Sequence, residues 1–176
     1  GAKSPEESGY YLSWGEVEPK DYYYWDTYKY SGDTDSAFTK YCFDSQYGLD
    51  GFVDNKLQLD LEDDAAHVNW GGNWRMPTKA EQDELREKCT WKWTTQNGVN
   101  GYKVTSKSNG NSIFLPAAGS RSGSSLNNAG SYGFYWSSSL GTDASYYAYY
   151  LRFYSSLVDW NDFGRCYGLS VRPVCQ

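Results

Sequence analysis

The sequence predicts an α+β fold, with two short helices in its first half and a small antiparallel sheet with long ordered loops in its second half. A helix-capping signal follows Pro77, and Asn-Gly turn signals separate aromatic and β-branched runs further along the chain. The length of 176 residues fits one domain, which we place over residues 1–176.

The helices are expected after two polar signals. Residues 1–40 alternate aromatic residues with Gly, Pro, Ser and Asp, which is typical of short strands and long loops. The acidic residues 60–64 suit the positive end of a helix dipole and predict a brief helix behind them. Thr78 and Glu81 have the spacing of a capping box, which predicts a helix over 78–88 with Ala80, Leu85 and Cys89 facing inward.

The strands are expected after residue 96. Turn signals at 96–98 and 108–110 flank a pair of strands, 102–105 and 112–116. Residues 117–140 are rich in Gly, Ser and Asn, so we expect an ordered loop there. Alternation predicts a half-buried strand over 147–154, and 169–174 is expected to form a closing strand.

Composition excludes several classes of partner. The chain has a net charge of −6 and no run of basic residues, so we expect neither nucleic acid nor an anionic membrane as partner. No apolar run approaches the ~18 residues that span a bilayer, so we expect no membrane insertion by this domain. No signal-peptide core is visible, and the start of the sequence leaves an upstream signal or anchor open.

The cysteines and the single histidine give no catalytic pattern. Cys42, Cys89, Cys166 and Cys175 lack CxxC spacing, which leaves one or two disulfides or free thiols open, with three full pairings. His67 is alone, and Gly-x-Ser-x-Gly, phosphate-loop and EF-hand patterns are absent. We therefore expect no catalytic residue, no cofactor and no metal, and predict that the protein is not an enzyme.

The candidate binding surface is the tyrosine-rich stretch 146–167. Tyr, Trp and Phe alternate there with Ser, Asp, Asn, Gly and Arg, as in antibody binding sites, where rigid aromatic rings provide contact area. We expect Tyr150, Leu151, Phe153 and Val158 to be core and the loop 161–167 to face outward. The predicted ligand-binding residues are Tyr146, Tyr147, Tyr149, Arg152, Tyr154, Asp159, Trp160, Asn161, Asp162, Phe163, Cys166 and Tyr167.

Four motifs in order carry a family resemblance: residues 70–78 (WGGNWRMPT), 115–119 (LPAAG), 135–138 (YWSS) and 168–174 (GLSVRPV). With them the chain resembles the Fibrobacter succinogenes major paralogous domain family over nearly its whole length. The resemblance implies a C-type lectin-like fold, related to formylglycine-generating enzyme domains. It also implies a gut-bacterial exported protein or lipoprotein at the cell surface, and a first strand trimmed near residues 2–7.

The resemblance extends to variable proteins of diversity-generating retroelements, in which adenine-directed mutagenesis rewrites Asn-type codons near the C-terminus. It implies variable positions among residues 146–167, including Cys166. The framework would then be Trp136, Tyr150, Leu151, Phe153, Val158, Arg165 and residues 170–174, and the structural thiols would be Cys42, Cys89 and Cys175.

Two departures from related families limit what the resemblance implies. Formylglycine-generating enzymes use a closely spaced pair of reactive cysteines, which Cys166 and Cys175 do not match. Trp160-Asn161-Asp162 reproduces a calcium and sugar motif of animal C-type lectins, but the companion Glu-Pro-Asn or Gln-Pro-Asp motif is absent. We predict an exported, receptor-like or adhesin-like domain that binds a protein or a glycan. The alternatives are a fixed structural module of a surface lipoprotein and an oxidase of the formylglycine-generating type.

Overall fold

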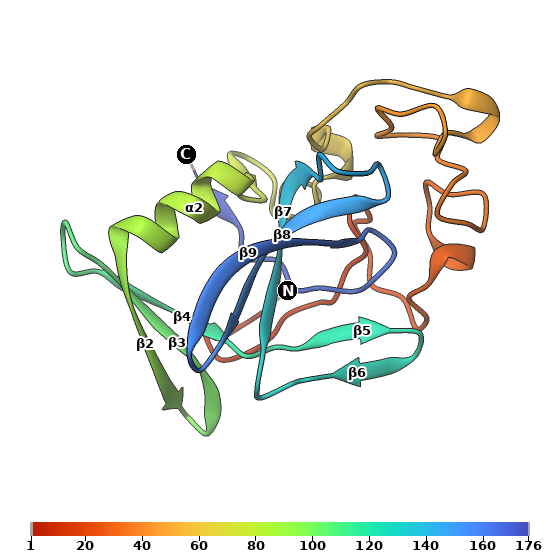
Figure 1. Cartoon of the computed structure of the whole chain (residues 1–176). Coiled ribbons are helices and arrows are strands. Elements are labelled where there is room, and N and C mark those ends of the chain that lie inside the picture. Colours follow the sequence, from red (N-terminus) through yellow and green to blue (C-terminus); the bar gives the residue numbers. More distant parts are fainter. Residues whose placement is uncertain (1, 176) are drawn as a thin grey trace.

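Small antiparallel sheets dominate the computed structural model, which describes residues 2–175 (Figure 1). Strands hold 38% of the chain and helices 14%, so the predicted α+β class is wrong and the structure is mostly β. Within these residues only α2 (Lys79–Lys88) exceeds two turns, because α1 (Ala65–Trp70) has six residues. The remaining helical segments are the 3-10 turns η1 (Trp25–Thr27), η2 (Leu49–Gly51) and η3 (Leu61–Asp63). No helix of this described part is long and apolar enough to cross a membrane.

Helix α2 confirms the capping-box prediction. The Thr78 hydroxyl accepts a bond from the Glu81 amide at 3.2 Å, and the Glu81 carboxylate accepts one from the Thr78 amide at 2.9 Å. The prediction that Ala80 faces inward was wrong, because Ala80 is exposed. Gln82 is the buried residue instead, and its amide donates to the carbonyls of Tyr135 and Trp136. A polar side chain therefore joins α2 to the neighbouring sheet.

The first sheet has the order β2 (Cys89–Gln96), β3 (Val99–Ser106) and β4 (Ser112–Pro116). The expected pairing of 102–105 with 112–116 is confirmed. Strand β2 was not predicted, although Trp91 and Trp93 alternate with polar residues in it. Both indoles contact the Tyr102 ring edge-on, which anchors β2 through aromatic packing.

The second sheet carries the tyrosine-rich stretch. Its order is β7 (Gly133–Leu140), β8 (Tyr147–Tyr154) and β9 (Leu157–Gly164), with β8 in the centre (Figure 1). The expected strand over 147–154 is confirmed. The loop expected over 117–140 is wrong, because β5 (Ser120–Ser122), β6 (Ser125–Asn127) and β7 lie within it. Ser137 is buried without leaving its hydroxyl unpaired, because the hydroxyl donates a hydrogen bond to the Tyr149 carbonyl at 2.8 Å.

The C-terminal segment forms less strand than predicted. Only β10 (Val174–Cys175) is a strand, and it pairs with β1 (Trp74–Arg75). Leu169 and Ser170 make single bridges to Leu12 and Tyr135. The expected strand over 169–174 is therefore wrong for most of its length.

Arg165 joins the N-terminal loops to the end of β9. Its guanidinium is fully buried and donates to the carbonyls of Tyr41 at 2.8 Å, Ser145 at 2.7 Å and Lys40 at 3.0 Å. It also donates to the Tyr28 hydroxyl. These bonds satisfy the buried cation and hold residues 28–41 beside the β8–β9 hairpin.

Candidate functional site

The predicted binding residues lie on both faces of the sheet. Successive side chains of a strand point to opposite faces, so Tyr147 and Tyr149 share one face of β8, and Arg152 and Tyr154 share the other. The β8–β9 register carries this division to the facing residues of β9. Residues 161–164 belong to β9, so the expected loop over 161–167 is wrong in its first half. The predicted single outward surface is therefore two surfaces.

The core predicted within this stretch is largely confirmed. Tyr150, Leu151 and Phe153 are buried, whereas Val158 is only partly buried and packs against the same cluster as Leu151. The two faces differ in which half of β8 they cover. One buries Leu151 and Phe153, and the other buries Ala148 and Tyr150, so the exposed parts of β8 lie at opposite ends on the two faces.

The first face carries a small cluster around Trp160. The ring of Trp160 lies edge-on to that of Tyr149 at 5.3 Å between centroids. The Lys79 ammonium sits 3.9 Å from the Trp160 centroid, and the Tyr149 hydroxyl is 2.7 Å from that of Thr142. The Lys79 ammonium therefore already occupies a face of the Trp160 ring at which another cation could bind.

The second face carries a row of six aromatic rings in sequential contact, which we call the aromatic row. Neighbouring ring centroids are between 4.4 and 5.9 Å apart. Tyr150 is buried within the row and its other members are partly exposed. The row runs, in order, through Tyr154, Tyr132, Phe134, Tyr150, Phe163 and Tyr167. Tyr132 and Phe134 were not predicted, because their stretch was interpreted as a loop.

The charged residues predicted for the surface are partly engaged within the fold. The Asp159 carboxylate lies 3.5 Å from Arg86 and 4.0 Å from Arg152. Consecutive residues Asn161 and Asp162 leave β9 on opposite faces, so they do not converge on one ion as the calcium motif would require.

A concave site lies where the aromatic row meets the open end of the β8–β9 hairpin. We call it the Trp25 pocket; its volume is about 320 Å³. Trp25 and Asp35 come from the N-terminal loops and were missed by the sequence analysis, since nothing in the sequence places them beside β9. The lining residues are Trp25, Asp35, Tyr146, Tyr147, Asp162, Phe163, Gly164 and Tyr167.

Electrostatics in the Trp25 pocket disfavour further negative charge. Burial raises the pKa of Asp162, and the neighbouring Asp143 adds to the shift. A hydrogen bond with Tyr146, together with burial, raises the pKa of Tyr147. The shift of Asp162 describes a site in which a positively charged ligand would be favourable.

The structure corrects the position of Cys166. This residue was predicted on the ligand surface, but it is fully buried in the core together with Cys42. Burial raises the pKa of the Cys166 thiol to about 12, so it is protonated at neutral pH and is a poor nucleophile. Cys42, Cys89 and Cys166 are free thiols, so the one or two disulfides considered from the sequence do not involve these three.

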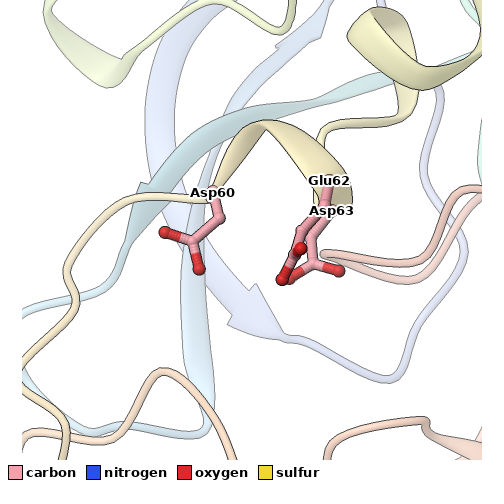
Figure 2. A group of neighbouring side chains, drawn as sticks. All are labelled: Asp60, Glu62 and Asp63. Atoms are coloured by element: carbon pink, nitrogen blue, oxygen red, sulfur yellow. The ribbon is translucent and has the colours of Figure 1, made fainter.

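A second acidic group lies at η3. The carboxylates of Asp60, Glu62 and Asp63 have oxygens within 4.8 Å of one another, and Figure 2 shows them projecting to the same side of the turn. The Lys40 ammonium lies 2.9, 2.7 and 2.6 Å from them, respectively. The Lys40 ammonium thus occupies the position among the three carboxylates that a metal ion would need.

Hydrogen bonds hold Asp63 ionised within this group. Tyr30 and Tyr41 both donate to its carboxylate, the latter at 2.6 Å. Burial alone would raise the pKa of Asp63, but the bonds from Lys40 and the two tyrosines outweigh it and hold the pKa at about 2. This group is a structural ion-pair network.

Comparison with known proteins gives a family without an assigned activity. No curated protein and no solved structure matches the chain. One family model, described as Domain of unknown function (DUF8237), matches residues 78–174, from the helix cap to the first residue of β10. Since this match covers more than half of the chain, the protein belongs to the DUF8237 family.

Proposed function

We propose that this chain is an exported, non-enzymatic binding domain that recognises a protein or a glycan through the aromatic row and the adjoining Trp25 pocket. The aromatic row is the observation that carries the proposal, because five partly exposed rings lie along one sheet face. A core needs no such exposure, whereas a binding surface does.

The chemistry of these side chains supports binding. Tyrosine presents a large apolar ring with a polar tip and has few rotatable bonds, so it loses little conformational entropy when a ligand binds. The rings already contact one another and four of the six are carried by paired strands, which presents them in a fixed geometry. Such a row can stack on sugar rings or accept the side chains of a protein partner.

We further propose that the pocket end of this surface is diversified by a retroelement, as the family resemblance implies. Tyr146, Tyr147 and Tyr167 would be among the variable positions, since Tyr codons are reached from Asn codons by adenine changes. Cys166 is withdrawn from this set because it is buried. A reverse transcriptase gene and a near-copy of the coding region for 146–167, differing at adenines, are expected in the source genome. Their absence would leave a receptor of fixed specificity.

The binding function is tested by removing two rings of the row that lie outside the pocket. The double variant Tyr132→Ala/Tyr154→Ala and the wild type are screened on glycan and cell-surface protein arrays. We expect a defined ligand of the wild type to bind the variant at least tenfold more weakly, since aromatic anchors carry much of such binding energy.

The matched control is Tyr10→Ala/Tyr22→Ala, which removes two exposed tyrosines outside the row and the pocket. Circular dichroism and thermal melting check that both variants fold. Equal ligand binding by the row variant and the control would contradict the assignment of the row as the binding surface.

A further inference from the structure

We propose that the Trp25 pocket binds an alkylated ammonium group, such as the head of choline or the end of a methylated lysine side chain. This inference rests on the proposed binding function and names the chemistry of one part of the ligand. Its basis is a pocket that combines aromatic walls with two carboxylates and no basic lining residue.

The walls present rings from three parts of the chain. Phe163 and Tyr167 are stacked with centroids 4.4 Å apart, and Tyr146 and Tyr147 are in contact at 4.2 Å. Trp25 belongs to the N-terminal loops. Faces of aromatic rings carry partial negative charge and attract cations, which is how cages for quaternary ammonium groups work.

Gly164 permits the close approach of two of these rings. A Cβ atom at this position would lie 2.9 Å from Cε2 of Tyr167 and 3.4 Å from Cζ2 of Trp25. The absence of a side chain at Gly164 therefore brings Trp25 and Tyr167 together around the hollow.

The charges of the pocket lack a counterion. Asp35 and Asp162 both line it, and within residues 2–175 neither carboxylate forms an ion pair or accepts a hydrogen bond from another residue's side chain. The buried carboxylate of Asp63, by contrast, has the Lys40 ammonium at 2.6 Å. A cationic ligand would supply the missing positive charge.

The partial burial of Asp162 strengthens this argument. Burial and Asp143 raise its pKa, which means that the ionised form lacks compensation in the protein alone. A bound cation beside it reverses that cost, because an opposite charge at short range favours the carboxylate.

The pocket suits an alkylated ammonium better than a metal ion. Calcium takes six to eight oxygen ligands, and magnesium needs a nearly ideal octahedron. Five of the eight lining residues are aromatic, and their rings cannot coordinate such ions but pack well against methyl groups. The combination of ring faces and carboxylate charge therefore selects an organic cation.

The test uses isothermal titration calorimetry of the full chain with choline, and with its uncharged isostere 3,3-dimethylbutan-1-ol. We expect choline to bind and the isostere to bind at least tenfold more weakly, since only the charge differs. Equal binding of the two compounds, or no binding of choline, overturns the proposal.

Variants locate the site. Asp162→Asn removes the charge, Tyr167→Ala removes a wall, and each is expected to weaken choline binding about tenfold or more. The matched control Asp21→Asn makes the same change at an exposed aspartate outside the pocket and is expected to keep wild-type affinity. Choline binding that survives both pocket variants would place the cation elsewhere and overturn the assignment.

Two further arms identify the source of the cation and separate this inference from the proposed function. A peptide with trimethyl-lysine that binds at least tenfold more tightly than choline indicates a protein ligand, and the reverse order indicates a free or lipid-borne choline head. Tyr132→Ala/Tyr154→Ala should bind choline normally, since it leaves the pocket intact. Loss of array binding with retained choline binding in this variant is the result that both proposals expect. Retained array binding would contradict the proposed binding surface, and loss of choline binding by the folded variant would contradict the pocket assignment.

Discussion

Two groups of aspartates in this molecule have the same chemistry and opposite surroundings. At η3, Asp63 and its neighbours surround the ammonium of Lys40, and Asp63 accepts hydrogen bonds from Tyr30 and Tyr41. In the Trp25 pocket, Asp162 stands among aromatic rings without a cation. The pKa of Asp63 is lowered and that of Asp162 is raised.

The difference shows how a fold separates structural charge from charge available to a ligand. Carboxylates that stabilise the fold have partners within the chain, so that folding completes their interactions. A carboxylate that is partly buried without a partner costs stability, and such sites are concentrated where ligands bind. Substitutions in the two groups should therefore change stability in opposite directions.

The largest effect is expected from Lys40→Met, which leaves three carboxylates close together without their shared cation. Of the three carboxylates only that of Asp63 is buried, and removing the cation from a buried carboxylate costs about 3 kcal/mol in the free energy of unfolding. Urea denaturation at neutral pH measures it. The matched control is Lys56→Met, because Lys56 is more exposed and pairs with Asp60 alone; its cost should stay below about 1 kcal/mol. Equal costs for the two variants would contradict the central role of Lys40.

The next effect is the acid dependence of stability caused by Asp63. Its pKa in the folded state is about 2 against an ordinary value of 3.8, so the folded state favours the ionised form. The resulting stability is fully present above about pH 4 and is lost as the pH falls toward 2. Asp63→Asn removes hydrogen bonds to a charged acceptor and should cost about 2 kcal/mol at pH 7.

Unfolding curves between pH 7 and 2 check this expectation. The difference in the free energy of unfolding between the wild type and Asp63→Asn should become smaller as the pH falls from 4 to 2, because protonation removes the same charge from the wild type. Ser137→Ala is a useful comparison, since it removes a buried hydrogen bond to the Tyr149 carbonyl, and neither of these groups titrates in this range. A difference in the free energy of unfolding that stays constant down to pH 2 would contradict the pKa assigned to Asp63.

Local signals predicted local structure well in this chain. The capping box of Thr78 and Glu81 and the alternation of 147–154 are both visible within a few residues, and both elements formed. The fold class failed because β7 contains three serines and a glycine beside its aromatic residues, and Ser and Gly are typical of loops. Its strand conformation depends on pairing with β8 and on partners for its buried serines, which are contacts distant in the sequence.

The binding surface was predictable in composition but not in shape. The aromatic residues of 146–167 are conspicuous in the sequence, and eleven of the twelve residues predicted there are at least partly exposed. The exception is Cys166, which is buried. It directly follows Arg165, whose buried guanidinium donates to the Ser145 carbonyl. Trp25 and Asp35 could not be predicted because long-range contacts, including those of Arg165, bring their loops to β9.

The smallest effect is expected from Asp162→Asn, and its sign distinguishes the two groups of aspartates. A raised pKa means that the folded state disfavours the ionised form, so Asp162 costs stability as the pH rises through its ordinary value of 3.8. Removing the charge should therefore stabilise the protein at pH 7, by up to about 0.5 kcal/mol because the site is only partly buried. Thermal unfolding at pH 7 should show a slightly higher midpoint for Asp162→Asn and no change for Asp21→Asn. A clear loss of stability would mean that the Asp162 carboxylate holds the fold together, as that of Asp63 does, and is not available to a ligand.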